Sequence, residues 1–591
     1  MKYRWSIQPQ QPARAAKLSA ALGRTPLLAQ CLLNRGLTEL EQVKSFLEPR
    51  LKQLADPFLI PNMQAAVDRL FAALEKQEPL VVFGDYDVDG VTSTALLLEA
   101  LRALGWQVNH YLPHRMDEGY GLTREAAENC LKKFPVTLVL AVDCGSSAVE
   151  TIAWLAGQGI DVLVLDHHQI TDPPPAACAL VNPLFGANRF AGETHGATDS
   201  ASPPASTAPR FSELCSAGLA FKLAHALAKR GRELNLPAAL TFDLKPFLDL
   251  VALGTIADLV PLTGENRILV TMGLERLNDT RRHGLLELMR VAEVKRPVGV
   301  YEVGFQLGPR LNAAGRLENA AEALDLILAT DAASARPLAV KLDARNRERQ
   351  KIEKSIVDEV LGAVRARFNP ESDYVIVEGQ LLWHVGVVGI VASRVLQQFY
   401  RPTIIVGGEG GQWRGSGRSI AGFDLAAALR ECDDLLVRHG GHAMAAGLTI
   451  DPERLAAFRT RLNDFARRTL SAELLQPILR LDAEVKLTQI SLPCLAELDR
   501  LNPIGQGNPS IQFVARNLTL TCPPRRMGAD KQHVKLSVSD GLVTLEAVWW
   551  RVGPEAQMPV HRFDLCFVPQ VNDFNGTRSV QLKVLDWQPA A

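Results

Sequence analysis

Three aspartates lie two positions apart in the stretch VVFGDYDVDGVTS, which covers residues 81–93. Asp85, Asp87 and Asp89 follow an apolar run and precede a glycine, where a buried strand would end. Carboxylates this close together repel one another, and a folded protein holds them together readily only when cations neutralise them. The stretch therefore indicates a metal site, with a solvated turn as the alternative for this motif alone.

More acids and imidazoles occupy similar places later in the chain. Asp143 follows the run VTLVLAV, Asp166, His167 and His168 follow IDVLVL, and Asp258 interrupts FLDLVALGTIADLVPL. Carboxylate and imidazole ligands suit Mn²⁺ or Mg²⁺, and imidazole favours manganese. Two such ions would activate a water and stabilise the leaving oxygen in phosphoester cleavage. The spacing lacks the terminal glutamate of an EF-hand, which argues against a calcium loop.

The elements that must position these residues indicate an α/β unit. PLVVFGDYD, QVNHYLP, VTLVLAVDCGSS and IDVLVLDHHQI are typical of strands, and STALLLEALRALGW is typical of a helix that ends near Gly105. Alternating strands and helices predict a parallel sheet with both faces covered. Ligands of such sheets collect at the carboxyl ends of the strands. Three strands place acids or imidazoles there, which argues against the solvated-turn alternative.

Composition limits the class of protein. The 591 residues are 47% hydrophobic and 22% charged, which is typical of globular proteins with several domains. The net charge of -1 excludes a bulk polycation, so any nucleic-acid contact must come from local basic patches. The nine scattered cysteines and the lack of a long apolar run predict a soluble cytoplasmic protein.

The second half has a different character. Residues 337–368 predict a long helix whose charged middle, ARNRERQK, is exposed on most sides, with an ordinary amphipathic surface helix as the alternative. DYVIVEG, PTIIVGG and WRGSGRS then indicate strands and turns of a second α/β domain. WRGSGRS and RHGGHAMAAG, the latter expected to open a small-residue helix, fit either an anion site or plain tight turns.

Five short alternating segments near the C-terminus predict an OB-fold barrel. They are FVARNLTLTCPP, HVKLSVSDG, LVTLEAVWWR, FDLCFVPQVN and SVQLKVLDW. Basic side chains and Trp549 or Trp550 fit single-strand binding, and at most one of these two tryptophans should be exposed because strand neighbours face opposite ways. Residues 185–210, rich in Ser, Ala, Pro, Gly and Thr, predict a disordered loop without an assigned function.

Taken in order, DYDVDG, DCG, DHH and GTIADLVPL resemble the motifs of the DHH phosphoesterases. Further segments narrow the resemblance to the RecJ family of single-strand-specific 5′→3′ DNA exonucleases. They are HRMDEGYGL, GPRLNAAGRL, HVGVVGIVASR, GSGRSIAGFDL, GGHAMAAG and LNPIGQGNPSIQF. The resemblance covers nearly the whole chain. It implies a metal-dependent exonuclease that releases nucleoside 5′-monophosphates and acts in DNA recombination and repair.

The resemblance also implies a domain order. It comprises an N-terminal helical segment (1–60), a parallel-sheet DHH metal-binding catalytic domain (61–330), a connecting helix (331–370), a smaller α/β DHHA1 substrate-binding domain (371–470) and an OB-fold nucleic-acid-binding domain (471–591). In the family, the DHHA1 domain faces the metal domain across a cleft.

The resemblance also assigns roles to individual residues, according to their positions in the motifs. The resemblance implies a catalytic centre for Mn²⁺ or Mg²⁺, with two ions expected, formed by Asp87, Asp89, Asp143, His167, His168 and Asp258, and with Asp85 adjacent as a ligand or a supporting group. It implies phosphate binding by Arg115, Arg310, Arg316, Arg414, Ser416, Arg418 and His442. Ion pairs with Glu118 or Glu318 are the alternative for the first three. Many relatives have a histidine ligand where this chain has Phe83, so the second ion is expected to bind weakly.

Single-stranded DNA, a single-strand-binding protein and a RecQ-type helicase are the partners that the resemblance implies. Two rival functions stay open at this point. One is a phosphodiesterase of short oligonucleotides or cyclic dinucleotides, against which the predicted barrel argues. The other is a non-catalytic DNA-binding relative, against which the intact acids and histidines argue.

Overall fold

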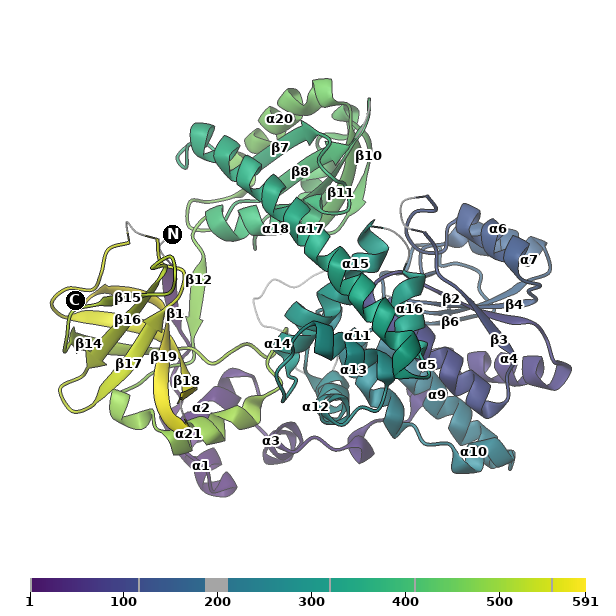
Figure 1. The fold of residues 1–591 in the computed structure, drawn as a ribbon, viewed down its shortest axis with the longest axis horizontal. Helices are drawn as coiled ribbons and strands as arrows, with labels where there is room; N and C mark the ends of the chain where they lie inside the picture. Colours follow the sequence, from purple (N-terminus) through teal and green to yellow (C-terminus); the bar gives the residue numbers. More distant parts are fainter. Residues whose placement is uncertain are drawn as a thin grey trace, which may run out of the picture. The chain divides into compact units, whose positions relative to one another are not determined.

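The computed structural model describes residues 3–114, 117–185, 211–317, 320–408, 411–553, 556–574 and 576–590. The chain divides into two compact units (Figure 1). Unit 1 contains Met1–Val43, Glu348–Leu501 and Ser510–Ala591, and unit 2 contains Lys44–Arg347 and Asn502–Pro509. Of the loop expected at 185–210, residues 186–210 lie outside the described residues.

Unit 2 is built on the expected parallel sheet. Its five strands are β2 (Leu80–Gly84), β3 (Val108–Tyr111), β4 (Leu138–Val142), β5 (Asp161–Leu165) and β6 (Ala179–Val181), in the order β3-β2-β4-β5-β6. All neighbouring pairs are parallel. The chain passes from β2 to β3 on one side and then crosses to β4 on the other side. A topological switch point therefore lies between β2 and β4, where doubly wound sheets bind their ligands.

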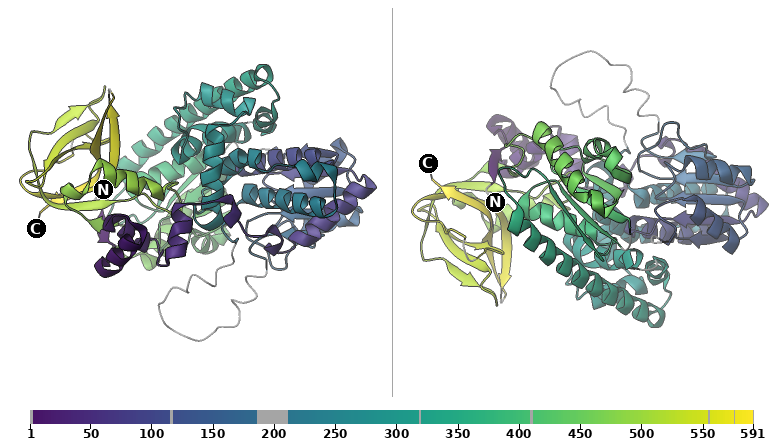
Figure 2. Two further views of the ribbon diagram at one scale, coloured as in Figure 1. Left: turned by 90° about the horizontal axis from the view of Figure 1, so that it is seen from below. Right: turned by 90° about the horizontal axis from the view of Figure 1, so that it is seen from above.

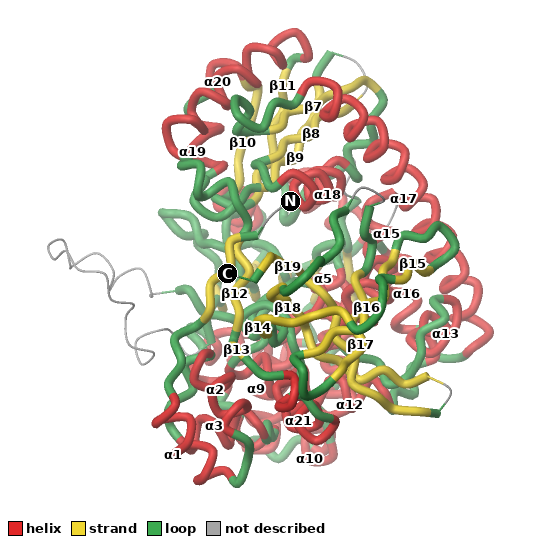
Figure 3. The backbone as a smooth tube through the Cα atoms, turned by 90° about the vertical axis from the view of Figure 1, so that its left-hand side faces the viewer, coloured by secondary structure: helices red, strands yellow, loops and turns green. Residues whose placement is uncertain are grey.

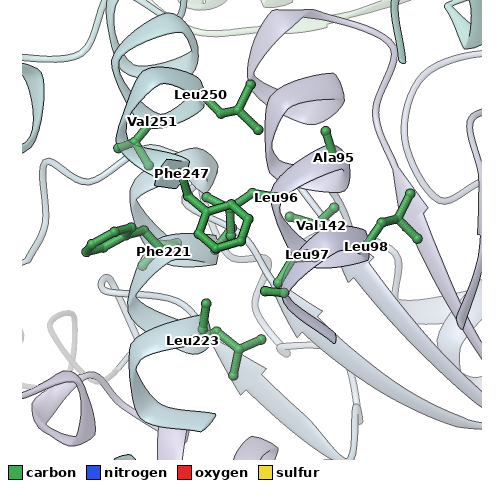
Figure 4. Packing of buried hydrophobic residues seen from close by; sticks show 14 of the residues in the cluster. Ala95, Leu96, Leu97, Leu98, Val142, Phe221, Leu223, Phe247, Leu250 and Val251 are labelled. Atoms are coloured by element: carbon green, nitrogen blue, oxygen red, sulfur yellow. The ribbon is translucent and has the colours of Figure 1, made fainter. Parts of the chain in front are cut away.

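Helices cover both faces of this sheet (Figures 1 and 2), and its alternating side chains belong to two apolar layers. Val82 and Val142 face the layer shared with α4 (Met63–Lys76), α5 (Val88–Leu104), α9 (Ser216–Glu233) and α11 (Leu248–Ala257). Figure 4 shows side chains of α5, α9 and α11 packed near Val142. Phe83 and Val139 face the other layer, shared with α6 (Arg124–Lys133) and α7 (Val149–Gly157). Covered on both faces, the sheet offers ligands only its strand ends.

Two helix ends in unit 2 matter for the site. Helix α5 begins earlier than the sequence indicated, because the Asp87 side chain caps it by accepting from the Gly90 N–H at 3.1 Å. It ends at Gly105, as expected, with φ of 108°. The run that Asp258 interrupts is helix α11, and Asp258 is its C-cap. Asp89 thus lies in the first turn of a helix and Asp258 at the end of another.

The other helices of unit 2 surround this core. They are α10 (Pro237–Thr241), α12 (Gly264–Asn278), α13 (His283–Val291), α14 (Val300–Glu302), α15 (Gly308–Leu317) and α16 (Ala321–Leu328).

Helix α17 (Ala332–Arg367) confirms the expected long helix and passes from unit 2 into unit 1. Its charged middle, ARNRERQK, has one buried face that includes Arg345 and Arg349, next to the buried Asp343, while most of its other residues are exposed, which is the pattern of the amphipathic alternative. Partners on other elements make this burial possible: Asp343 accepts from Arg310 at 2.9 Å, and Arg345 contacts Glu322 at 2.9 Å. No described helix is long and apolar enough to cross a membrane.

Unit 1 contains the second α/β domain. Its strands are β7 (Ile376–Leu381), β8 (Thr403–Gly408), β9 (Trp413–Arg418), β10 (Leu436–Gly441) and β11 (Ala445–Ile450), in the order β10-β11-β9-β8-β7 (Figure 3). Helices α18 (Val388–Phe399), α19 (Leu425–Arg430) and α20 (Leu455–Thr469) accompany them. The helix expected at the start of GGHAMAAG is wrong: this stretch is the β10–β11 hairpin. Ala446, Leu448 and Ile450 are buried at every second position, which is the period of a strand.

The C-terminal barrel contains all five expected strands. They are β14 (Phe513–Leu520), β16 (His533–Ser539), β17 (Thr544–Trp549), β18 (Phe563–Phe574) and β19 (Thr577–Pro589), joined by β13 (Ala483–Glu484) and β15 (Arg525–Met527). Strand β14 pairs with both β18 and β16, which closes the barrel. Helix α21 (Leu492–Leu498) precedes β14. Trp550 is exposed and Trp549 half-buried, so only one tryptophan is exposed, as expected.

The N-terminal segment is not purely helical. Strand β1 (Arg4–Ile7) pairs in parallel with β12 (Ile478–Leu481), and α1 (Pro12–Leu22), α2 (Pro26–Asn34) and α3 (Leu40–Leu47) follow. The Trp5 indole donates to Asp586 at 2.9 Å, and the Thr25 amide donates to Glu497 at 2.9 Å. These contacts tie the N-terminus to the C-terminal part of the same unit.

Candidate metal centre and phosphate-binding residues

The carboxyl ends of β2, β4 and β5 bring the predicted acids to one level. Gly84 pairs with Val142, and Val142 pairs with Leu165, so the next residues, Asp85, Asp143 and Asp166, lie side by side. All three of these aspartates are buried. The hydrogen bond from the Asp143 amide to the Leu165 carbonyl continues the ladder at 3.1 Å. Sheet register thus assembles the acidic cluster that the sequence predicted.

Asp89 is held by the start of helix α9. Its carboxylate oxygens accept from the Ser216 N–H at 2.7 Å and from the Ala217 N–H at 2.8 Å. The first N–H groups of a helix have no partner within it and carry positive potential, so they favour a carboxylate. Helix α11 comes close at Gly254, where a Cβ would lie 2.8 Å from Asp89 Oδ1. Three helices therefore fix the orientation of Asp89.

Asp143 is held by both backbone and side chain. Its φ of 63° lies in the left-handed region, which is uncommon for a residue other than glycine. The Ser216 hydroxyl donates to Asp143 Oδ1 at 2.9 Å. Ser216 therefore contacts two of the predicted ligands, Asp89 through its amide and Asp143 through its hydroxyl.

His167 faces three carboxylates. Its Nε2 atom lies 3.9 Å from Asp89 Oδ2, 3.6 Å from Asp143 Oδ1 and 3.4 Å from Asp258 Oδ2. His167 Nε2 and Asp258 Oδ2 are buried atoms without a hydrogen-bond partner among the described residues. Ligands of one small divalent cation lie about 3–4 Å from each other, because each is about 2 Å from the ion. The donor set and its spacing therefore fit Mn²⁺ or Mg²⁺.

His168 is oriented by Asp166 rather than aimed only at the acids. Its Nδ1 lies 2.8 Å from Asp166 Oδ1, and its Nε2 lies 3.3 Å from the Tyr120 hydroxyl. Asp166 also accepts from the amides of Ser146 and His167. Burial lowers the pKa of His168, but the Asp166 hydrogen bond and charge outweigh it and raise the pKa to about 9. His168 is therefore protonated at neutral pH in the protein without metal.

Mutual repulsion perturbs the carboxylates. Burial and the charge of Asp87 raise the pKa of Asp89 to about 6, and burial and the charge of Asp89 raise the pKa of Asp258 to about 9. The pKa of Asp143 is also raised, first by burial and then by Asp89. Burial and the neighbouring His168 lower the pKa of His167 to about 4, so its imidazole is neutral. Excess negative charge beside a neutral imidazole is the environment that a divalent cation stabilises.

A second group of acids adjoins the first. Asp85, Asp87 and Asp143 have carboxylate oxygens within 4.8 Å of one another, so they form a candidate site that shares Asp143 with the His167 group. Phe83 does not belong to it: its ring is buried and stacks on Tyr111 with centroids 5.5 Å apart. The position that carries a histidine in many relatives therefore packs the core here.

The structure thus gathers all seven predicted metal-centre residues at one edge of the sheet. Sequence reasoning missed Ser216 and Gly254, which lie far along the chain in helices without a recognisable motif. Asp166 was visible beside the two histidines, but its role in orienting His168 was not.

The glycine-rich stretch WRGSGRS of unit 1, which was expected to contribute phosphate-binding residues, forms strand β9 and not a loop. Strand β9 pairs with β8 and β11, so its backbone N–H groups belong to the sheet, and an anion site here would have to use side chains. Gly415 and Gly417 serve packing, because a Cβ there would lie 3.0 Å from Val406 and 2.6 Å from Leu425. Arg414, Ser416 and Arg418 alternate with these glycines and so share the opposite face.

Arg418 is a cation without a carboxylate partner among the described residues. Its Nη1 donates to Ser416 Oγ at 2.9 Å and to the Gly417 carbonyl at 2.7 Å. Burial lowers its pKa. Its register partner on β11 is Ala445, so the hairpin turn that carries the exposed His442 lies at the same end of the sheet. Arg418, Ser416 and His442 therefore remain candidates for phosphate contacts.

Three further arginines were predicted to bind phosphate, namely Arg115, Arg310 and Arg316. Arg310 forms the ion pair with Asp343 described above and donates to the Gln306 carbonyl at 2.7 Å. Arg310 therefore forms a structural ion pair, which was the alternative to phosphate binding, but its partner is Asp343, where Glu318 was expected. Arg115 lies outside the described residues, and so does the side chain of Arg316.

Comparisons with known proteins agree with this arrangement. Three family models match: the DHH family N-terminal domain over residues 79–255, the DHHA1 domain over 372–468 and the RecJ OB domain over 481–586. Single-stranded-DNA-specific exonuclease RecJ of Bacillus subtilis (strain 168) is 38% identical over 590 residues, which cover 99% of this chain and 71% of that protein.

Solved structures extend the comparison. The crystal structure of RecJ from Thermus thermophilus in complex with Mn²⁺ has a TM-score of 0.81 at 30% identity, covering 100% of this chain and 80% of that chain. The crystal structure of the same protein in complex with Mg²⁺ has a TM-score of 0.75 at 29% identity, covering 100% of this chain and 79% of that chain. With the acids and histidines of the motifs gathered at one edge of the sheet, the chain belongs to the RecJ family.

Proposed function

We propose that this protein degrades single-stranded DNA from the 5′ end, using Mn²⁺ or Mg²⁺, and releases nucleoside 5′-monophosphates. As a member of the RecJ family, it is a single-stranded-DNA-specific exonuclease. The observation that carries the chemistry is His167 Nε2 at 3.4, 3.6 and 3.9 Å from three carboxylates. The match of residues 481–586 to the RecJ OB domain favours this function over the dinucleotide alternative.

The residues of the centre have distinct proposed roles. A divalent cation would activate a water molecule and stabilise charge on the phosphoryl oxygens. Asp89, Asp143, His167 and Asp258 would hold it, and Asp85 and Asp87, with Asp143, would hold a second ion. The α9 amides and the Ser216 hydroxyl keep Asp89 and Asp143 oriented for this task.

We assign His168 a different role from the other ligands. Its Nδ1 is engaged by Asp166, whose hydrogen bond and charge raise the pKa of His168 and favour its protonated form. An imidazolium at the rim of the acidic cluster can bind a phosphate oxygen or donate a proton to the leaving oxygen. Its half-exposed side chain, 42% accessible, is open to a substrate.

For the direction of cleavage, we propose that Arg418 and Ser416 bind the terminal 5′-phosphate. Support comes from the guanidinium of Arg418, which has no carboxylate partner among the described residues, and from the hydroxyl beside it. Arginine suits this task because its planar fork matches phosphate oxygens. Arg414 and His442 are proposed as further phosphate contacts on the same domain.

We also propose protein partners and a cellular location. A RecQ-type helicase would supply single strands and a single-strand-binding protein would present them, which fits an enzyme of recombination and repair. All nine cysteines are free, which supports a reducing, cytoplasmic location. Co-purification with each candidate partner, with an Arg418→Ala variant as control, would test direct contact.

The function is tested with one oligonucleotide labelled at either end. The purified protein, with Mn²⁺ or Mg²⁺, should release labelled mononucleotide first from the 5′-labelled strand, and it should leave a blunt duplex largely intact. First release from the 3′ label would overturn the polarity, and equal digestion of the duplex would overturn the strand specificity.

A further inference from the structure

The segment Asn502–Pro509, here called the strap, has an unusual place in the fold. It belongs to unit 2, although the chain on both sides of it belongs to unit 1. The strap is a tight turn in which Gly505 and Asn508 exchange backbone hydrogen bonds of 2.9 and 3.2 Å. The Asn508 amide donates to the Pro503 carbonyl at 2.8 Å. Its shape is therefore set by its own contacts.

The strap packs against the stretch that follows the end of helix α11. The Leu262 N–H donates to the Gln506 carbonyl at 2.7 Å. A Cβ at Gly505 would lie 2.7 Å from Leu262 Cδ1, and a Cβ at Gly507 would lie 2.9 Å from Pro261 Cβ. A side chain at either position would force Leu262 or Pro261 to move, so the strap backbone packs directly on residues 261–262.

Arg267 anchors the other end of the strap. Its side chain is 2% exposed, and its Nη2 donates to the Asn502 carbonyl at 2.7 Å. Its Nε donates to the Phe46 carbonyl at 2.7 Å, and the guanidinium stacks 3.6 Å from the Phe46 ring. A buried guanidinium with these contacts holds the strap firmly, because leaving it unsatisfied would be costly.

Asn266 joins this assembly to the metal centre. It is 1% exposed, and its Nδ2 donates to the Pro261 carbonyl at 3.0 Å and to the Glu213 carbonyl at 2.5 Å. Pro261 follows Asp258 closely in the chain, and Glu213 precedes Ser216, whose amide holds Asp89. One amide group thus connects the segment that carries Asp258 with the segment that orients Asp89.

We propose that Asn266 and the strap are positioning elements of the metal centre, which hold Asp258 at the distance from Asp89 that binding of a divalent cation requires. The proposal rests on the metal centre proposed above. Asp258 is the C-cap of α11, and its N–H still donates to the Gly254 carbonyl at 2.9 Å, but the chain leaves the helix at the next residue, Leu259, whose φ is 62°. Helix α11 thus holds Asp258 on its N-terminal side, and the strap and Asn266 hold the chain just after it, at Pro261 and Leu262.

The test compares matched pairs of variants by titrating Mn²⁺ calorimetrically into the full-length protein. Asn266→Ala is paired with Asn278→Ala, because Asn278 lies on the same helix and its Nδ2 also donates to two carbonyls, at 2.8 and 2.9 Å. Gly507→Ala is paired with Gly541→Ala, because both glycines have positive φ, 72° and 89°, but a Cβ at Gly541 meets nothing within 4 Å. Thermal denaturation of each variant without metal measures the general cost to the fold.

We expect Asn266→Ala and Gly507→Ala each to raise the Kd for Mn²⁺ about tenfold or more, as loss of outer contacts to a metal site does. Nuclease activity should recover at saturating Mn²⁺, so that the metal activation constant changes more than kcat. Asn278→Ala and Gly541→Ala should bind Mn²⁺ within about twofold of the unmodified protein. Unchanged Mn²⁺ affinity in both test variants, or an equal loss in the controls, would overturn the positioning role while leaving the proposed function intact. Failure of the unmodified protein to bind Mn²⁺ would instead overturn the metal centre itself.

Discussion

Gly254 offers a quantitative test of how the helices hold Asp89. A Cβ at this position of α11 would lie 2.6 Å from Ala217 Cβ, 2.6 Å from Thr92 Oγ1 and 2.8 Å from Asp89 Oδ1. Gly254→Ala must therefore push α9 away or turn the carboxylate of Asp89. Either movement disturbs the hydrogen bond from the Ala217 amide to Asp89, now 2.8 Å.

The expected loss of stability in Gly254→Ala combines three contributions. Overpacking a core costs about 1–3 kcal/mol, and weakening a hydrogen bond to a charged group costs about 1.5–3 kcal/mol. Alanine gains about 1 kcal/mol over glycine in a helix interior. We expect Gly254→Ala to destabilise the α9–α11 contact by roughly 2–5 kcal/mol and to weaken Mn²⁺ binding by about tenfold or more.

Gly362→Ala is the matched control. Gly362 lies inside helix α17, and a Cβ there meets nothing within 4 Å, so this change should stabilise its helix by about 0.5–1 kcal/mol. Hydrogen exchange of the α9 and α11 amides measures local stability, and calorimetry measures Mn²⁺ affinity. If Gly254→Ala exchanges and binds Mn²⁺ as Gly362→Ala does, the helices do not constrain Asp89 and the reasoning fails.

Three further outcomes are expected. Asp143→Ala or His167→Ala should abolish cleavage while leaving single-strand binding intact, measured by fluorescence anisotropy; near-normal turnover would refute their roles as ligands. Arg418→Ala should raise KM more for 5′-phosphorylated than for 5′-hydroxyl strands, and an equal loss on both would place Arg418 at an internal phosphate or in the fold alone. The pKa values of Asp258 and His168, both raised to about 9 from 3.8 and 6.5, mean that the folded protein without metal binds protons more tightly than the unfolded chain. Its thermal stability should therefore fall as the pH rises from about 6.5 to 9, and saturating Mg²⁺ should reduce this fall; a profile that is flat without metal would contradict the coupled charges.

The metal centre was predictable where sheet geometry alone decides the outcome. Asp85, Asp143 and Asp166 each follow an apolar strand, and parallel strands in register must bring their ends to one edge. The position of each aspartate after an apolar strand was therefore enough to predict that the three lie close together. The same holds for the five barrel strands, whose two-residue period is visible in the sequence.

Other features depend on partners that no local pattern reveals. Ser216 reaches Asp89 and Asp143 because α9 packs beside α5, and nothing near Ser216 in the sequence indicates that contact. The charged middle of α17 was expected to be exposed on most sides, yet Arg345 lies on a buried face of the helix, where it pairs with Glu322 of another helix.

Glycine-rich stretches were misread for a related reason. GGHAMAAG has small residues that fit a helix, a turn or a strand, and pairing of β11 with β9 and β10 decides in favour of the hairpin. In WRGSGRS, Gly415 and Gly417 avoid collisions with Val406 and Leu425 rather than exposing amides to an anion. Close packing and phosphate binding both require glycine, so the residue type alone does not separate them.

The most direct test of the central claim is anomalous X-ray diffraction from crystals of the protein grown with Mn²⁺. We predict a manganese peak close to His167 Nε2 and Asp258 Oδ2, which are buried atoms without a hydrogen-bond partner among the described residues, with Asp89 and Asp143 as the other ligands. Manganese peaks elsewhere on the protein, with none among these four residues at saturating Mn²⁺, would contradict the assignment of this edge of the sheet as the metal centre.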